Sequence, residues 1–179
     1  MSFEVPQGSE KGRYVQAMFD AIAVNYDRVN DLMTAGAHRQ WKREVVSLTR
    51  LAPGGKALDL ATGTGDIAFL LADKVGKTGE IVGLDFSEGM LAIARERALD
   101  GRPITWVQGD MTALDFPDAT FDAVTVGYGL RNVTDLDKAL SEIHRVLKPG
   151  GRAVSLDLGK PRLKLVRWGT DLYSFPVGP

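Results

Sequence analysis

A short apolar run that contains an acid and then breaks into a glycine turn constrains this chain more than any other stretch. Residues 57–66 read Ala-Leu-Asp-Leu-Ala-Thr-Gly-Thr-Gly-Asp and lead into a second apolar segment. This order predicts a strand, a tight loop and a helix that begins near Asp66. Glycines in such a loop let the backbone approach a ligand closely, as nucleotide-binding α/β proteins do. We therefore expect an α/β protein with a ligand site at this loop.

The same alternation of strand and helix patterns continues along the chain. Five strands alternating with helices imply a mostly parallel, twisted sheet with helices on both faces. Two helices are expected before the first strand, the second with Trp41, Val45 and Leu48 on its buried face. The expected strands are 56–61, 81–85, 104–107, 121–126 and 152–158, and the expected helices are 14–26, 38–51, 66–75, one capped by Ser87, one capped by Thr134 with Asp137, and 163–175.

Composition excludes several classes of protein. The chain has 179 residues, 44% of them apolar, and 22 Lys and Arg against 23 Asp and Glu. This near-neutral balance gives no reason to expect a nucleic-acid partner. Cysteine is absent, so disulfides and thiolate metal sites are excluded, and we expect no metal. No signal peptide is recognisable, and no apolar run approaches the roughly 20 residues that span a bilayer. A cytoplasmic protein is expected.

Four loops follow the carboxyl ends of the predicted strands, where open α/β sheets bind ligands. The first offers backbone amides and small side chains, and the second ends in an acid placed to accept hydrogen bonds from ribose hydroxyls. The third offers an acid for an adenine amine and a methionine for the adenine ring. The fourth, Gly127-Tyr128-Gly129, is expected to lie under the amino-acid end of the cofactor. This combination predicts S-adenosylmethionine. The expected cofactor residues are Gly63, Thr64, Gly65, Asp85, Asp110, Met111 and Gly127.

An NAD-type dehydrogenase is the nearest alternative. The NAD-binding loop normally has a third small residue after its two glycines, and Ala68 could fill that position. The acid after the third strand and the Lys-Pro-Gly-Gly turn at 148–151 favour the methyl donor. The acids also have simpler interpretations, since Asp85 can cap a helix and Asp110 can form a turn. Asp59 is expected to support the loop by bonding its amides, and Asp66 to interact with the helix dipole.

Three stretches carry a resemblance to a known family. They are Phe19–Asn30 continuing to His38–Trp41, Gly129–Asp135 with the sequence Gly-Leu-Arg-Asn-Val-Thr-Asp, and Arg145–Arg152. On these residues the chain resembles the ubiquinone/menaquinone-biosynthesis C-methyltransferases, of the demethylmenaquinone methyltransferase type, over residues 14–176. The resemblance implies a Rossmann-like methyltransferase fold that binds S-adenosylmethionine, and it points to Thr64, Asp85, Asp110 and Met111 as cofactor residues.

The chain departs from the family pattern at five positions. Val29 stands where the family has Met, Thr34 where it has Ser, Asp157 where it has Glu, Gly159 where it has Ser, and Gly127 where Ser is common. The changes at 159 and 127 remove side-chain contacts. Family members also continue beyond this C-terminus, so the C-terminal strands of the sheet are expected to be missing from this sequence.

The reaction that the resemblance implies is methylation of a ring carbon of a prenylated quinol, most simply demethylmenaquinol to menaquinol. Arg131, Asn132 and Tyr26 are the expected catalytic residues, which hold a water molecule or stabilise the phenolate. Each has an alternative role: an ion pair for Arg131, a turn for Asn132, packing for Tyr26. His38 is expected to be structural, although it could be a base, and His144 is expected to be non-catalytic. A methyltransferase with another small substrate and a non-catalytic cofactor-binding scaffold remain alternatives.

The expected organisation has three parts. Residues 1–52 cover the active site, residues 53–160 form the cofactor-binding core, and residues 161–179 begin a substrate-covering segment. Segment 160–168 interleaves Lys and Arg with apolar residues, which is typical of a solvated helix face but also of a peripheral membrane contact. A homodimer is one assembly that the resemblance allows.

Overall fold

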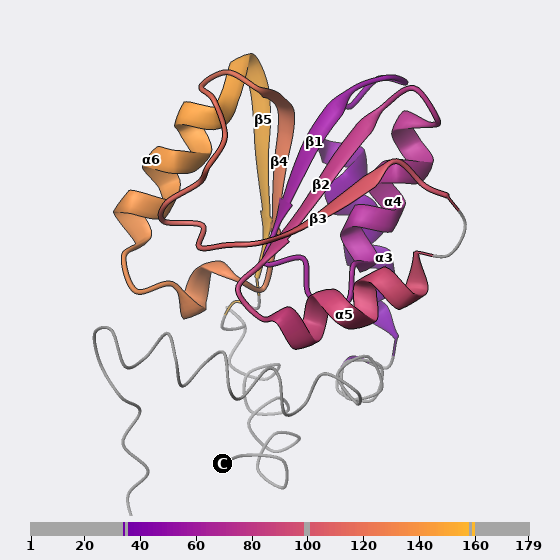
Figure 1. Cartoon of the computed structure of the whole chain (residues 1–179), viewed down its shortest axis with the longest axis horizontal. Helices are drawn as coiled ribbons and strands as arrows, with labels where there is room; N and C mark the ends of the chain where they lie inside the picture. The colour runs from indigo at the N-terminus through magenta and orange to yellow at the C-terminus, as the bar shows by residue number, and fades with distance from the viewer. Residues whose placement is uncertain (1–33, 35, 99–100, 158, 160–179) are drawn as a thin grey trace, which may run out of the picture.

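A computed structural model describes residues 34, 36–98, 101–157 and 159 (Figure 1). The expected helices at 14–26 and 163–175 and the membrane-contact segment 160–168 lie outside these residues. The described elements follow each other as helix α3 (Ala37–Leu48), strand β1 (Lys56–Leu60), α4 (Asp66–Val75), β2 (Glu80–Asp85), α5 (Glu88–Arg97), β3 (Ile104–Gln108), β4 (Phe121–Gly127), the 3₁₀ turn η2 (Leu130–Asn132), α6 (Leu136–Val146) and β5 (Leu147–Leu156).

The five strands form one parallel sheet in the order β3-β2-β1-β4-β5. The chain moves outward from β1 to β3, returns to the other side of β1 as β4, and continues to β5. The strand order therefore reverses between β1 and β4, which is where sheets of this kind bind ligands. The predicted parallel α/β architecture is confirmed, and each predicted strand between 56 and 126 has its counterpart within one or two residues. The predicted start of the fifth strand is wrong: β5 begins at Leu147, directly after α6, and includes residues 148–151, where a turn is expected from the sequence.

Both faces of the sheet are covered. In Figure 1 helix α6 lies on one side of the strands and α3 and α4 lie on the other. Neighbouring residues of β1 point to opposite faces: Ala57 packs with α3 and α4, and Leu58 packs with the residues of α6. Ile81 and Val82 divide in the same way on β2. This alternation explains why the strands read as continuous apolar runs.

The buried face of α3 differs from the prediction. Val45 is buried as expected, but Trp41 is 37% exposed and Leu48 is 54% exposed. The helix instead buries His38 and Lys42. The cause is an ion pair, because the Lys42 ammonium reaches inward to Asp66 on α4 at 2.7 Å. The apolar stem of the lysine is buried along the way.

The start of α6 also differs from the prediction by one residue. Asp135, not Thr134, caps the helix, and its carboxylate accepts a hydrogen bond from the Lys138 N–H at 3.0 Å. A carboxylate at this position also complements the helix dipole, which a threonine cannot do. Ser87 caps α5 as predicted, accepting from the Met90 N–H at 3.1 Å.

Candidate functional site

A cleft opens at the carboxyl ends of the central strands, where the strand order reverses. It is lined by residues that follow β1, end β2, follow β3, follow β4 and follow η2. The cleft contains about 870 Å³ of empty volume, part of it open to solvent. Five of the seven predicted cofactor residues meet here: Gly63, Asp85, Asp110, Met111 and Gly127.

The loop after β1 is a tight left-handed turn. Gly63 and Gly65 have φ values of 56° and 91°, which glycine adopts without strain. The Gly65 N–H donates to the Thr62 carbonyl at 3.0 Å. A Cβ at Gly65 would lie 2.6 Å from the Trp106 ring, so this glycine packs against β3 and does not line the cleft. Thr64 is buried and also lies off the cleft wall, where its carbonyl accepts from Arg97 at 2.8 Å.

Asp85 joins the second strand to this loop. One carboxylate oxygen accepts from the Gly63 N–H at 2.7 Å, and the other accepts from the Ser87 N–H at 2.9 Å. A carboxylate offers about four acceptor sites, so these two bonds do not exclude hydroxyl groups of a ligand. The predicted helix-capping alternative is partly right, because Asp85 also supports the backbone that enters α5.

Asp110 and Met111 lie in a second turn, after β3. The Asp110 carboxylate accepts from the Thr112 N–H at 2.8 Å, and its carbonyl accepts from the Ala113 N–H at 3.0 Å. This local turn orders the backbone on which both side chains stand. Met111 also packs against the apolar core under α6. The turn-forming alternative for Asp110 is thus compatible with a place on the cleft wall.

Asp59 lies behind the loop, fully buried, and its two oxygens accept from the hydroxyls of Thr125 and Thr62, both at 2.6 Å. The expectation that Asp59 bonds loop amides is therefore wrong, because its two carboxylate oxygens accept hydrogen bonds from threonine hydroxyls instead. Burial raises the pKa of Asp59 to about 6, against the opposing effect of these hydrogen bonds. Asp59 links β1, β4 and the loop beneath the cleft.

Asp66 opens helix α4, as predicted, but its main partners are cations. Its carboxylate contacts Lys42 and Arg97, each at 2.7 Å. Burial alone would raise the pKa of Asp66, but Lys42 and Arg97 together hold it below its usual range. His38, on α3, and the exposed His144, on α6, do not line the cleft, which agrees with a structural role for both.

The segment after β4 carries a residue that sequence reasoning missed. Tyr128 has a φ of 58° and lines the cleft. This conformation is strained for a bulky residue. It stands between two glycines that make close approaches: a Cβ would lie 2.8 Å from Ile67 at Gly127 and 2.5 Å from Ala61 at Gly129. The only sequence signal for Tyr128 is its position between these glycines.

The predicted catalytic residues are placed unequally. Asn132 lines the cleft. Arg131 does not; its guanidinium forms an ion pair with Asp157 and stands 5.7 Å from the centre of the Tyr128 ring. The ion-pair alternative for Arg131 is thus present in the structure, next to the cleft. Tyr26 lies outside the described residues.

The lining of the cleft suits S-adenosylmethionine. Two carboxylates, Asp85 and Asp110, stand on neighbouring loops as hydrogen-bond acceptors, which matches ribose hydroxyls and an exocyclic amine. Met111 adds an apolar surface, and Gly63 presents backbone where a Cβ would meet nothing within 4 Å. In the part of the chain that the structure describes, no group of three His, Asp or Glu residues could hold a metal ion.

Comparison with known proteins agrees with this geometry. Ubiquinone/menaquinone biosynthesis C-methyltransferase UbiE of Hydrogenovibrio crunogenus is 46% identical over 179 residues, which cover 98% of this chain and 70% of that protein. Demethylmenaquinone methyltransferase of Symbiobacterium thermophilum is 44% identical over 174 residues, which cover 96% and 69%.

A solved structure shares the fold. The SAM-dependent methyltransferase from Aquifex aeolicus superposes with a TM-score of 0.62 at 23% identity, covering 76% of this chain and 78% of that one. This likeness supports the Rossmann-like architecture alone. The model of the ubiE/COQ5 methyltransferase family matches residues 7–179. With these relatives and a cleft at the reversal of the strand order, the chain belongs to the ubiE/COQ5 methyltransferase family.

Proposed function

We propose that this protein is an S-adenosylmethionine-dependent C-methyltransferase that converts a prenylated demethylquinol, most simply demethylmenaquinol, to its ring-methylated product. Family membership and the names of the relatives support this reaction. The observation that carries it is the cleft, which brings together Asp85 and Asp110 from the ends of β2 and β3 and Asn132 from the segment after β4, on the other side of β1 in the sheet.

The chain's own residues divide the work of holding the cofactor. Asp85 binds the ribose hydroxyls, Asp110 accepts from the adenine amine, and Met111 packs on the ring. The backbone at Gly63 and Gly127 leaves room for the amino-acid end. When bound, the cofactor supplies an electrophilic methyl group on its sulfonium sulfur. Positioning this group in line with the acceptor carbon contributes much of the acceleration.

The acceptor needs a residue that stabilises negative charge. Loss of a hydroxyl proton to water places electron density on the neighbouring ring carbon, which would bond to the methyl carbon as the S–CH3 bond breaks and S-adenosylhomocysteine leaves. Loss of the ring C–H proton to solvent and return of one proton to the oxygen then restore the quinol. A guanidinium is a poor base but stabilises an oxyanion well. Arg131, held by Asp157 beside the cleft, serves this purpose, with Asn132 and Tyr26 orienting the water.

Membrane contact and assembly extend this proposal. No helix among the described residues is long and apolar enough to cross a membrane. A substrate with a prenyl tail resides in the bilayer, so a peripheral contact through segment 160–168 gives the enzyme access to it. Neutralising Lys160, Arg162, Lys164 and Arg167 should reduce cosedimentation with anionic liposomes. A homodimer is testable by sedimentation velocity, where a single monomeric species would remove it.

A direct experiment compares cofactors and acceptors. Calorimetry should detect binding of S-adenosylhomocysteine but not of NAD. Turnover with reduced demethylmenaquinone and with the corresponding demethylated benzoquinol then identifies the acceptor, and we expect the naphthoquinol to be methylated faster. Binding of S-adenosylhomocysteine without methylation of either quinol would instead support a cofactor-binding scaffold.

A further inference from the structure

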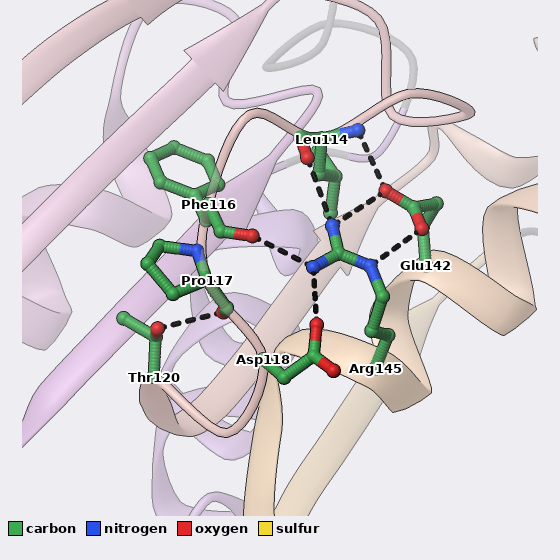
Figure 2. A network of polar contacts seen from close by, with 7 residues as sticks. All are labelled: Leu114, Phe116, Pro117, Asp118, Thr120, Glu142 and Arg145. Carbon is green, nitrogen blue, oxygen red and sulfur yellow. Dashed lines mark hydrogen bonds and ion pairs between the residues drawn. The ribbon is translucent and has the colours of Figure 1, made fainter.

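Arg145, in the last turn of α6, uses every N–H of its guanidinium group. Its five donors make five hydrogen bonds of 2.7–2.8 Å (Figure 2). Two of them reach backbone carbonyls of the loop between β3 and β4, those of Leu114 and Phe116. The others reach the carboxylates of Asp118 on the same loop and of Glu142 on α6. Arg145 is therefore hydrogen-bonded to three residues of the loop, Leu114, Phe116 and Asp118.

Glu142 completes this contact from the same helix. One of its carboxylate oxygens accepts from the Leu114 N–H at 2.8 Å while also accepting from Arg145. Leu114 therefore has both its N–H and its carbonyl bonded to side chains of α6. The hydrogen bonds from Arg145 lower the pKa of Glu142 to about 2, so this contact persists across the neutral range. Figure 2 shows the Arg145 guanidinium group between the loop residues Leu114, Phe116 and Asp118 on one side and Glu142 on the other.

The loop that Arg145 binds begins at the part of the cleft formed by Asp110 and Met111, here called the cofactor wall. Asp110 and Met111 line the cleft, and only two residues separate Met111 from Leu114. The turn at Asp110 bonds to Thr112 and Ala113, and Leu114 is buried in the core under α6. No freely rotating segment therefore lies between the Arg145 contact and the two cofactor residues.

Helix α6 also begins at the cleft, next to the lining residues that follow β4, here called the acceptor wall. Asn132, Val133 and Thr134 line the cleft, and Asp135 caps the helix directly after them. One helix thus follows the acceptor wall at its first turn and holds the cofactor wall at its last turn. The bonds of Arg145 and Glu142 therefore connect the loop after Met111 to the helix that follows Thr134.

We propose that Arg145 and Glu142 are positioning residues for the cofactor, which hold Asp110 and Met111 in place through the 114–118 loop. This inference rests on the proposed function, because it assigns the adenine end of the cofactor to that wall. Neither residue lines the cleft, so they act through the loop and not by contact. The expected effect is on cofactor affinity and not on the chemical step.

The test compares substitutions of Arg145 and of Glu142 with a matched control substitution in the same loop. Arg145→Lys keeps the charge but cannot reach four acceptor groups from one ammonium. Thr120→Ala removes a hydrogen bond inside the loop, from the Thr120 hydroxyl to the Pro117 carbonyl at 2.7 Å, without touching α6. Glu142→Gln is the second variant, since its amide loses the charge, offers one acceptor oxygen in place of the two that serve Leu114 and Arg145, and keeps the volume of the side chain. The full chain is used throughout.

We expect Arg145→Lys to raise the Kd for S-adenosylhomocysteine about tenfold, the equivalent of about 1.4 kcal/mol. The KM for S-adenosylmethionine should rise with it, while kcat at saturating cofactor and the KM for the quinol stay within about twofold, because uniform binding affects KM alone. Thr120→Ala should leave all four values unchanged. Calorimetry is performed well below the Tm of each variant, so that global destabilisation does not reduce binding.

Either of two results would overturn the inference. One is a folded Arg145→Lys protein with the affinity of the unchanged chain; if that variant does not fold, unchanged affinity in Glu142→Gln has the same meaning. The other is an equal loss in Thr120→Ala, which would reflect general loosening of the loop. Failure of the proposed function is distinguishable, because the unchanged chain itself would then fail to bind S-adenosylhomocysteine or to methylate a quinol.

Discussion

The Asp85 carboxylate accepts a hydrogen bond from the Gly63 backbone N–H at 2.7 Å. This bond joins the acid at the end of β2 to the glycine loop after β1, so the two features proposed to bind the cofactor form one unit. A ligand that binds Asp85 therefore meets a carboxylate whose orientation is already set by the loop. Pre-ordering of this kind lowers the entropic cost of binding.

Replacing Asp85 with Asn should weaken cofactor binding by about 10- to 100-fold, since hydrogen bonds to a charged group contribute roughly 1.5–3 kcal/mol. The amide keeps the shape of the side chain but loses the charge and one acceptor. Isothermal titration with S-adenosylhomocysteine measures the change. Asp137→Asn, on the exposed part of α6, is the matched control. Equal affinity in the two variants would remove Asp85 from the cofactor site.

Replacing Arg131 with Ala should lower kcat by about two to three orders of magnitude, the loss typical of an oxyanion-stabilising group. Binding of S-adenosylhomocysteine should not change, because Arg131 does not line the cleft in which the cofactor residues meet. Asp157→Asn should show a smaller loss, since the arginine stays but its ion pair is gone. Arg95→Ala, which breaks an exposed ion pair with Glu88, controls for charge. Turnover equal to that of the control would exclude Arg131 from the reaction.

Tyr128 offers a test of backbone strain. Tyr128→Gly and Tyr128→Ala both remove the ring, but only alanine keeps a Cβ at a φ of 58°. The glycine variant should be the more stable of the two by about 1 kcal/mol, the lower end of the cost of such a conformation. At the exposed helical site Ala92 the order should reverse, with Ala92→Gly less stable by about 0.5–1 kcal/mol. Urea unfolding measures both pairs, and the same order at both sites would argue against strain.

Asp59 predicts an unusual pH dependence. Its pKa rises from the ordinary 3.8 to about 6 on folding, so between these values the folded state binds more protons than the unfolded state. Its contribution to the free energy of unfolding therefore falls as pH rises from about 4 to about 6, and then stays constant. The total is about 3 kcal/mol at roughly 1.4 kcal/mol per pKa unit.

Asp59→Asn isolates this contribution, because the variant keeps the other titrating groups. The stability of the variant relative to the unchanged chain should increase over this pH window, as measured by urea unfolding at pH 4, 5, 6 and 7. A difference between the two proteins that does not depend on pH would show that Asp59 titrates normally.

The elements and the cofactor wall could be predicted from the sequence because their signals are local. Apolar runs, the glycines at 63 and 65 and the acids after strands mark positions whose neighbours in the chain determine the structure. Asp85 and Asp110 follow parallel strands, and the carboxyl ends of parallel strands meet at one edge of the sheet. Their arrival in one cleft therefore needs no knowledge of side-chain packing.

The contacts that the sequence did not reveal join residues far apart in the chain. Arg145 reads as one of many surface cations, and nothing near it shows that the carbonyls of Leu114 and Phe116 will face it. The same is true of Lys42. Its ion pair with Asp66 holds the Lys42 side of α3 against α4, so Trp41 and Leu48 remain exposed. Partner identity in such pairs is decided by tertiary packing, which periodicity alone does not encode.

The most direct measurement of the central claim is methyl transfer from S-adenosylmethionine with a trideuterated methyl group to reduced demethylmenaquinone, followed by mass spectrometry and carbon NMR of the quinone product. We predict that an intact trideuteromethyl group appears on the ring carbon, and that the signal is lost in Arg131→Ala although that variant still binds S-adenosylhomocysteine. Label on a ring oxygen, or binding of S-adenosylhomocysteine with no labelled quinone, would contradict a quinol C-methyltransferase.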